Sequence, residues 1–320
     1  MIKRIAVLTT GGDAPGMNPA IRSVVRYAIH QELEVMGVFR GWWGLINEEL
    51  KPLTHRSVSG IIGEGGTILK TARCPEFRTQ VGMARACETI KKNNIDGLVV
   101  IGGNGSFSAA HEFYKKFFIP SVGIAASIDN DVNGIDYTIG TDTAVNTALD
   151  AIDKIRDTAT SMERIFVVEV MGRESGFIAL TVALAGGCED VIIPEKTLDL
   201  NLICHDIVHG NLVGKMSWII VIAEGAGKAD DIARQITEIT GLETRTVVLG
   251  HVQRGGRPTA VSRDLALNLG KAAVDCLIAG KADIALGLAA GKMVEVDFET
   301  AIRKKELKID NFYKLIKILT

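Results

Sequence analysis

Short apolar runs alternate with helical patterns along most of the chain. The apolar runs predict buried strands at residues 5–9, 35–39, 98–101, 121–124, 165–170, 191–193, 218–223 and 246–249. Helical periodicity predicts helices at 17–30, 57–66, 79–92, 106–117, 139–160, 175–185, 198–212, 228–240 and 260–280. Strands that are apolar throughout are typical of parallel sheets covered by helices on both faces. The pattern therefore predicts a doubly wound, three-layer α/β fold.

Composition narrows the classes of function and partner. The chain has 320 residues, which predicts about two domains, and 47% of them are apolar. A net charge of −2 argues against nucleic acid or an anionic membrane as a partner. The basic run 303–305 is interpreted as the solvated face of a helix. Five cysteines without a C-x-x-C pair, and no long apolar stretch, predict a cytoplasmic protein without disulfides.

Glycines and acids follow several of the predicted strands. Gly11 and Gly12 follow the first strand, a glycine turn at 102–106 follows another, and Asp129 and Asp131 follow the next. Parallel strands bring their carboxyl ends to one edge of a sheet, where ligands bind. Backbone N–H groups for phosphates, an acid for Mg²⁺ and a base for a hydroxyl are the requirements of phosphoryl transfer.

Arginines stand at both ends of two other predicted strands. Arg164 and Arg173 flank one strand, and Arg245 and Arg254 flank another. The planar guanidinium donates two hydrogen bonds at once and so suits phosphate. For any single arginine, structural ion pairing remains the alternative. Together with His251 and Glu224, which closes a further strand, these residues are typical of a sugar-phosphate site.

Six motifs resemble those of the bacterial ATP-dependent 6-phosphofructokinases. The similarity runs in order and at matching spacing from residue 3 to about residue 300. The motifs are TGGDAPGMN at 10–18, TARCPEFR at 71–78, GGNGS at 102–106, SIDND at 127–131, VMGR at 170–173 and GHVQRGG at 250–256.

The resemblance implies a role for each matching residue. Asp129 would be the general base for the 1-hydroxyl of fructose 6-phosphate, and Arg73 and Arg173 would offset charge in the transition state. Mg²⁺ would be held by Asp131 and Asn104. The residues implied in ATP binding are Gly12, Arg73, Cys74, Arg78, Gly103, Asn104, Gly105 and Ser106. Those implied in sugar-phosphate binding are Ser127, Asp129, Arg164, Met171, Gly172, Arg173, Glu224, Arg245, His251 and Arg254.

The resemblance also implies an assembly and a regulatory site. It predicts a homotetramer in which Arg164 and Arg245 act on a neighbouring subunit. A nucleotide-binding domain would comprise residues 1–138 and 252–303, and a sugar-phosphate domain residues 139–251 and 304–320. An effector site for ADP or phosphoenolpyruvate would use Arg22, Arg26, Arg156, Gly187, Glu189 and Lys215. Charged side chains of relatives are replaced here by His55, Gly60, Met216 and Ser217, which predicts blunted allosteric control.

Departures from the family pattern concern the metal and the nucleotide. Asn104 replaces an acid, Ala125 and Ala126 replace a Pro-Gly turn, and Trp42 replaces a tyrosine near the adenine in relatives. These changes predict weaker handling of Mg²⁺ and ATP. Pyrophosphate-dependent relatives carry Asp at the position of Gly105, so this glycine favours ATP. A pyrophosphate-dependent enzyme and a weakly catalytic sugar-phosphate or nucleotide sensor remain the alternatives.

Overall fold

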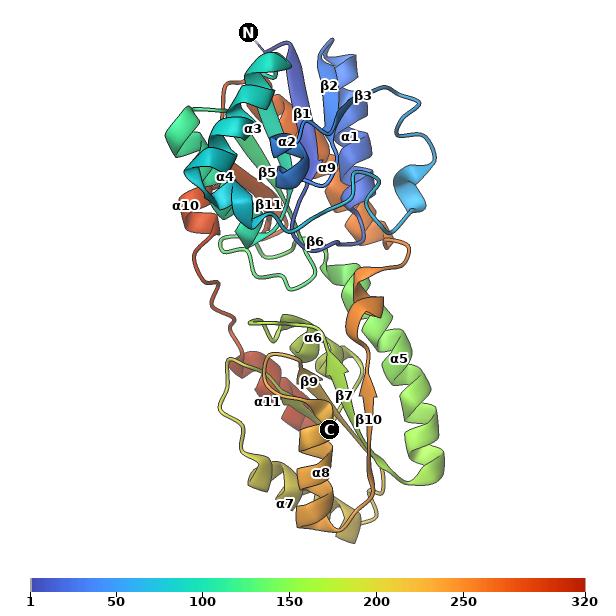
Figure 1. Ribbon diagram of the computed structural model, residues 1–320. Helices are drawn as coiled ribbons and strands as arrows, with labels where there is room; N and C mark the ends of the chain where they lie inside the picture. The colour runs from blue at the N-terminus through green and yellow to red at the C-terminus, as the bar shows by residue number, and fades with distance from the viewer. Residues whose placement is uncertain (1, 320) are drawn as a thin grey trace. The chain divides into compact units, whose positions relative to one another are not determined.

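The computed structural model describes residues 2–319, which form two compact units (Figure 1). Unit 1 comprises Met1–Thr143 and Arg254–Lys305, and unit 2 comprises Ala144–Gln253 and Glu306–Thr320. The chain therefore passes between the units after residues 143, 253 and 305. Which unit binds nucleotide and which binds sugar phosphate stays a prediction.

Unit 1 contains an eight-stranded sheet. Along the sheet the order is β12 (Lys292–Asp297), β11 (Ile284–Ala289), β5 (Ser121–Ser127), β4 (Gly97–Gly102), β1 (Arg4–Thr9), β2 (Glu34–Val38) and β3 (Leu50–Leu53), and β6 (Ile139–Gly140) pairs with β5. The central strands are parallel, whereas β3 and β12 pair antiparallel with their neighbours at the two margins. The carboxyl ends of β1, β4 and β5 therefore lie together at one edge.

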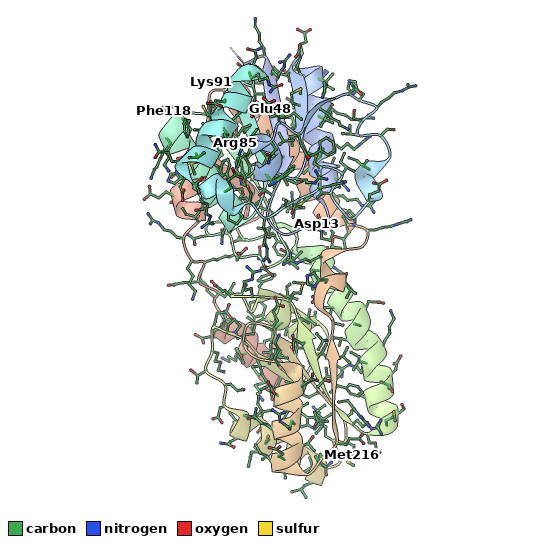
Figure 2. The ribbon with its side chains drawn as sticks, viewed as in Figure 1. Asp13, Glu48, Arg85, Lys91, Phe118 and Met216 are labelled. Carbon is green, nitrogen blue, oxygen red and sulfur yellow. The ribbon has the colours of Figure 1, made fainter. Side chains whose placement is uncertain are left out.

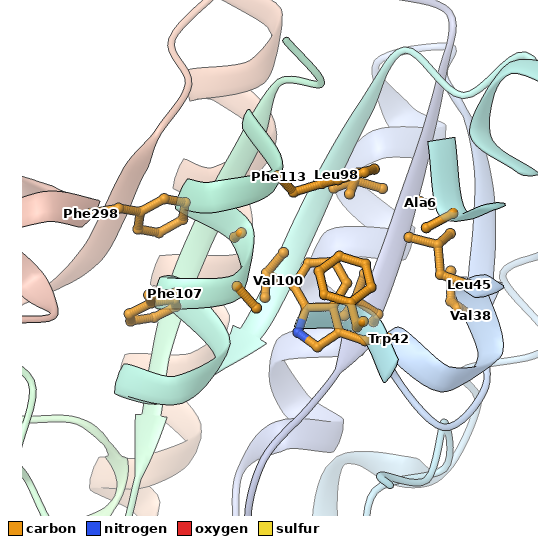
Figure 3. Packing of buried hydrophobic residues seen from close by; sticks show 14 of the residues in the cluster. Ala6, Val38, Trp42, Leu45, Leu98, Val100, Phe107, Phe113 and Phe298 are labelled. Atoms are coloured by element: carbon orange, nitrogen blue, oxygen red, sulfur yellow. The ribbon is translucent and has the colours of Figure 1, made fainter. Parts of the chain in front are cut away.

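Helices cover both faces of this sheet. On one face α1 (Met17–His30) packs against α9 (Ala260–Ile278). The other face carries α2 (Trp42–Ile46), α3 (Gln80–Lys92), α4 (Asn104–Phe117) and α10 (Phe298–Ala301). Figure 3 shows the core beneath these helices, where Trp42 stacks on Phe77 with ring centroids 4.2 Å apart and Phe107 stacks on Phe298 at 5.2 Å. This core fixes α4, whose first turn borders the strand ends.

Unit 2 is a smaller parallel sheet in the order β10 (Thr244–Val248), β7 (Ile165–Val170), β9 (Trp218–Ala223) and β8 (Asp190–Ile192). The helices α7 (Leu200–Leu212) and α8 (Ala229–Thr240) bury one face of it. The remaining helices are α5 (Thr141–Met162), α6 (Phe177–Ala185) and α11 (Asp310–Leu319), and α11 packs on α6 and β8. Among the described residues, no helix combines the length and the apolar character that a membrane span requires.

The predicted doubly wound α/β class is confirmed, because mainly parallel sheets carry helices on both faces. The helix predicted at 57–66 is wrong, since only a 3₁₀ turn, Ile61–Gly63, forms there. Four glycines in ten residues weaken a helix, and Gly60 adopts a φ of +81°. The antiparallel strands β3 and β12 were not predicted, because short exposed edge strands lack the continuous apolar signal.

Candidate active site

The two glycine turns of unit 1 pack directly against each other. The Thr10 N–H donates to the Ile101 carbonyl at 3.1 Å, and Ser106 Oγ donates to the Thr10 carbonyl at 3.1 Å. A Cβ on Gly102 would collide with both Ser106 and Thr10, so this close approach requires glycine. Helix α4 begins at Asn104, within the second glycine turn, and the N–H groups of a helix N-terminus form an anion site. The turns therefore place phosphate-binding backbone at the sheet edge.

The predicted metal residues lie beside each other at this edge. Asn104 Nδ2 donates to the Asp131 main-chain carbonyl at 2.9 Å and to Asp131 Oδ2 at 3.2 Å. Ser127 Oγ donates to Asp131 Oδ1 at 2.9 Å and accepts from the Asp129 N–H at 3.3 Å. Two neutral donors thus orient the Asp131 carboxylate and leave lone pairs on both of its oxygens.

The Asn104–Asp131 pair fits a magnesium ion that is shared with a substrate. Asn104 Oδ1 is buried and has no hydrogen-bond partner among the described residues. Mg²⁺ is usually bound through one or two carboxylates together with substrate phosphates and water. Within residues 2–319, no cluster of three or more His, Cys, Asp or Glu side chains could hold a metal alone. The residues therefore suit a metal that arrives with phosphates.

The loop that carries the acids is built around Asn130. We call residues 128–136 the acid loop. Asn130 is fully buried with a φ of +52°, a left-handed conformation that asparagine tolerates better than most residues. Its Nδ2 donates to the Asp136 carbonyl at 2.7 Å, and its Oδ1 accepts from the Thr138 N–H at 3.1 Å. This internal bonding holds Asp129 and Asp131 on either side of a fixed residue.

The alanines before the acid loop lie in regular strand rather than in a tight turn. Ala125 pairs with Gly102 of β4, and Ala126 pairs with Ile139 of β6. Both alanine side chains are buried. The expectation that they disturb a turn is therefore wrong, because β5 continues through them to Ser127.

Lys305 contacts the acid loop and was missed by sequence reasoning. Its Nζ donates to the Asn130 carbonyl at 2.9 Å and to the Ile135 carbonyl at 2.6 Å. The interpretation of residues 303–305 as a solvated helix face is wrong, because α10 ends at Ala301 and Lys305 is half-buried. The basic run 303–305 gives no sign in the sequence that Lys305 contacts the acid loop, which lies 170 residues earlier at Ile135.

The predicted nucleotide residues 73–78 follow a segment tied to the first glycine turn. Thr71 Oγ1 donates to the Gly11 carbonyl at 2.6 Å. Arg73 and Arg78 are exposed, whereas the neighbouring Phe77 enters the core. Cys74 is partly buried, and burial raises the pKa of its thiol. Phe77 thus packs this segment against the core, while Arg73 and Arg78 stay accessible to a ligand.

Trp42 is a core residue. Its side chain is 4% exposed, stacks on Phe77 and meets the edge of Phe113, which is labelled in Figure 3. The indole Nε1 is buried without a hydrogen-bond partner among the described residues. Its contribution in this structure is therefore packing under α3 and α4, and a direct effect on adenine stays a prediction.

Arg254 lies in unit 1 against the first glycine turn. Its Nη1 donates to the Asp13 carbonyl at 3.3 Å, and a Cβ on Gly12 would collide with its guanidinium. Asp13, labelled in Figure 2, has a pKa raised by burial, partly offset by the N–H groups of Thr67 and Ala14 and by Arg254. The structure therefore groups Arg254 with Gly12, within the unit that carries the acid loop.

Unit 2 gathers most of the predicted sugar-phosphate residues at one sheet edge. Met171, Gly172 and Arg173 follow β7, Glu224 follows β9, and His251 follows β10. The Met171 N–H donates to Gln253 Oε1 at 2.8 Å, and the Glu224 N–H donates to the Val170 carbonyl at 2.9 Å. These bonds hold the three loops together at the carboxyl ends of adjacent strands.

Arg164 and Arg245 lie at the opposite edge of this sheet. Arg164 precedes β7, Arg245 is the second residue of β10, and both pair with Glu243, with Arg164 Nε 3.2 Å from Glu243 Oε2. The sequence pattern had already placed these two arginines at the amino ends of their strands, and the structure agrees. The length of the strands, about 3.3 Å per residue, separates them from the loops after β7 and β9.

The predicted effector residues are held by local contacts within each unit. In unit 1 Arg22 donates to the Val58 carbonyl at 2.7 Å. The pKa of Arg22 is lowered, mainly by burial and also by the neighbouring charge of Arg26. In unit 2 Arg156 Nη2 donates to the Gly187 carbonyl at 2.8 Å, and Lys215 Nζ lies 3.3 Å from Glu189 Oε1.

Solved phosphofructokinases share this fold. Phosphofructokinase from Saccharomyces cerevisiae superimposes with a TM-score of 0.89 at 34% identity, over 94% of this chain and 45% of that chain. A pyrophosphate-dependent phosphofructokinase from Marinobacter aquaeolei superimposes with a TM-score of 0.85 over 99% of this chain and 91% of that one. Its identity is 21%, which supports likeness of fold alone.

Curated relatives match over the full length. The ATP-dependent 6-phosphofructokinase of Clostridium botulinum (strain Hall) is 50% identical over 319 residues, which is 100% of both chains. The protein of the same name from Clostridium acetobutylicum is 51% identical over 94% of each chain. Residues 4–277 also match the family described as Phosphofructokinase. The chain therefore belongs to the phosphofructokinase family.

Proposed function

We propose that this chain is an ATP-dependent 6-phosphofructokinase. It transfers the γ-phosphoryl group of ATP to the 1-hydroxyl of fructose 6-phosphate and releases fructose 1,6-bisphosphate and ADP, a step of glycolysis. The observation that carries the proposal is the acid loop bonded to the first turn of α4 through Asn104 and Asp131. Full-length identity of 50% to proteins of that name supports the same reaction.

Separate residues serve the proton and the metal. Asp129 takes the proton from the sugar hydroxyl, which then attacks the γ-phosphorus in line. Asp131 and Asn104 Oδ1 would hold Mg²⁺, which would neutralise charge on the phosphates when bound. The Gly103–Ser106 turn donates backbone N–H groups to the nucleotide phosphates. Arg73 and Arg173 stabilise the charge that develops on the transferred group.

The sugar-phosphate residues support a homotetramer. Met171, Gly172 and Glu224 hold the sugar, and His251 and Arg254 bind its 6-phosphate. Arg164 and Arg245 lie at the other sheet edge of their own unit, so we propose that they complete the site of a neighbouring copy. A cytoplasmic location accords with the substrates.

Gly105 favours ATP over pyrophosphate as the donor. A Cβ added there meets nothing within 4 Å, so the space above this turn is open. An open position is compatible with the α-phosphate of a nucleotide. The proposal therefore assigns pyrophosphate no more than a minor role as donor.

An aldolase-coupled assay with ATP and with pyrophosphate tests the proposal. We expect fructose 1,6-bisphosphate formation with ATP and little with pyrophosphate. Asp129→Asn should lower kcat about 10²–10⁴-fold, because it removes the base. Asp150→Asn, at an exposed position paired with Lys154, is the matched control and should leave kcat unchanged.

Two results would contradict the assignment. Product formation with pyrophosphate alone would indicate the pyrophosphate-dependent reaction. Binding of fructose 6-phosphate in calorimetry without turnover by either donor would indicate a sensor.

A further inference from the structure

The acid loop is held by a segment from the end of unit 1. The Asn133 N–H donates to the Ala301 carbonyl at 3.1 Å, and Asn133 Nδ2 donates to the Thr300 carbonyl at 3.1 Å. Val132 forms an isolated antiparallel bridge with Lys304. These contacts align residues 300–305 along the loop, although more than 160 residues separate the two segments.

Lys305 closes this contact with its side chain. Its ammonium donates to the carbonyls of Asn130 and Ile135, at 2.9 and 2.6 Å, so one charge bridges both ends of the loop. Hydrogen bonds from a charged donor are about twice as strong as neutral ones. Lys305 is also the last residue of unit 1.

One of the carbonyls that Lys305 holds belongs to Asn130, whose backbone is left-handed. Asn130 has a φ of +52°, and such backbone persists where the surroundings over-determine it. Asn130 lies between the proposed base and the proposed metal ligand in the sequence. A rotation of the peptide plane on either side of Asn130 would therefore change the orientation of the Asp129 and Asp131 side chains relative to each other.

Electrostatics fit the same arrangement. The pKa of Lys305 is lowered, because burial outweighs the attraction of Asp136 and Asp131. Two hydrogen bonds to carbonyls and the attraction of these carboxylates stabilise the half-buried ammonium group. An apolar side chain would leave both carbonyls without this donor.

We propose that Lys305 is a positioning residue for phosphoryl transfer. It acts through the Asn130 main chain and sets the angle between Asp129 and Asp131 without contacting substrate. The inference rests on the proposed function for its kinetic consequence. The tethering of the loop itself stands on the contacts described above.

Three variants of the full-length protein test the role. Lys305→Met removes the donor, Lys305→Arg keeps a charged donor, and Lys304→Met removes an exposed neighbouring charge as the matched control. We expect Lys305→Met to lower kcat by about ten- to a hundredfold with little change in KM for either substrate, since small misplacements of reacting groups cost that much. Lys305→Arg should recover part of kcat, and Lys304→Met should match the parent protein.

Hydrogen exchange provides a readout that does not depend on activity. In Lys305→Met, peptides covering residues 128–136 should exchange faster than in the parent, while peptides of α7 and α8 should not change. If Lys305→Met does not fold, Lys305→Gln, which retains an uncharged donor, takes its place and should give an intermediate loss. Parent-like kcat and parent-like exchange in the acid loop would overturn the inference. An inactive parent protein would instead refute the proposed function, and the exchange result would still decide whether Lys305 tethers the loop.

Discussion

At the scale of single residues, the Asn104 amide both donates hydrogen bonds and offers an acceptor oxygen. An ionised carboxylate at this position could only accept. Its Nδ2 donates to the Asp131 carbonyl and carboxylate, while its Oδ1 is left for another partner. With Asp at this position, a carboxylate oxygen would replace the donor that now lies 3.2 Å from Asp131 Oδ2. Two like charges at such a distance repel by about 1–5 kcal/mol, depending on solvent access.

We predict opposite effects of Asn104→Asp with and without metal. In EDTA the variant should melt below the parent protein, because the two carboxylates repel. In Mg²⁺ it should gain more thermal stability than the parent and bind the metal more tightly, because a ligand that binds the folded state stabilises it. Thermal melts across a Mg²⁺ titration measure both effects. Asn104→Ala is the control that removes donor and oxygen without adding charge, and identical Mg²⁺ midpoints in all three proteins would refute the prediction.

The residues of this pair could be identified from motifs, but their bonding could not. The order Gly103–Ser106 and Ser127–Asp131 in the sequence predicted two neighbouring strand ends, which the parallel pairing of β4 and β5 confirms. Lys305 gave no such sign, because its contact depends on how a distant segment returns along the loop. Arg254 likewise sits with Gly12 for reasons of tertiary packing.

At the scale of elements, the first turn of α4 carries Gly105, the residue that we propose favours ATP over pyrophosphate as the phosphoryl donor. Gly105 is exposed, has open space at its Cβ position and does not have a positive φ. A side chain there should not strain the fold, and an acid in the first turn of a helix interacts favourably with the helix dipole. If a variant at this position uses ATP less well, the cause is therefore its contact with the nucleotide and not a change in the fold.

We predict that Gly105→Asp raises KM for ATP at least about tenfold, which corresponds to 1.4 kcal/mol of lost binding. Its melting temperature should equal or exceed that of the parent protein, since aspartate is favoured near a helix N-terminus. Steady-state kinetics and calorimetry measure the two quantities. Gly105→Ala is the matched control for size without charge, and an unchanged KM in Gly105→Asp would contradict the reading of this turn.

Element types were predictable where burial is uniform. The strands β4, β7 and β9 are buried along their whole length, and β1 is buried after Arg4, so all four appeared as continuous apolar runs. The edge strand β12 alternates between exposed and half-buried residues and pairs with β11 only through the antiparallel return of the chain. Ala125 and Ala126 were misread because a family's turn at a position does not fix the backbone of a different sequence there.

At the scale of the whole molecule, the predicted site residues are divided between two units according to where the chain crosses. Asp129, Asp131, Asn104 and Arg254 belong to unit 1, whereas Arg173 and Glu224 belong to unit 2. Arg254 lies one residue beyond the second crossing at 253, within the segment 252–303 that was predicted to return to the first domain. The predicted effector residues are divided in the same way, with Arg22 and Arg26 in unit 1 and the others in unit 2.

The whole-molecule prediction concerns the response to phosphoenolpyruvate. Met216, labelled in Figure 2, and Ser217 lie just before β9, where a phosphorylated effector would require positive charge. Glu189, in the same unit, already pairs with Lys215 and accepts from the Ile219 N–H at 2.7 Å. Because Met216 and Ser217 carry no positive charge, an anionic effector gains less on binding than it would beside cationic side chains at these two positions.

Allosteric coupling is typically worth about 1–3 kcal/mol, which corresponds to roughly a 5–150-fold shift in affinity. We expect phosphoenolpyruvate to shift the half-saturating concentration of fructose 6-phosphate by less than about fivefold, below that range. Saturation curves with and without the effector measure this shift. The double variant Met216→Lys with Ser217→His should enlarge it, because two groups that can carry positive charge return beside Lys215, whereas Lys304→Met should not. A strong change in Hill coefficient in the parent protein, or no gain in the double variant, would show that the effector is recognised by other residues.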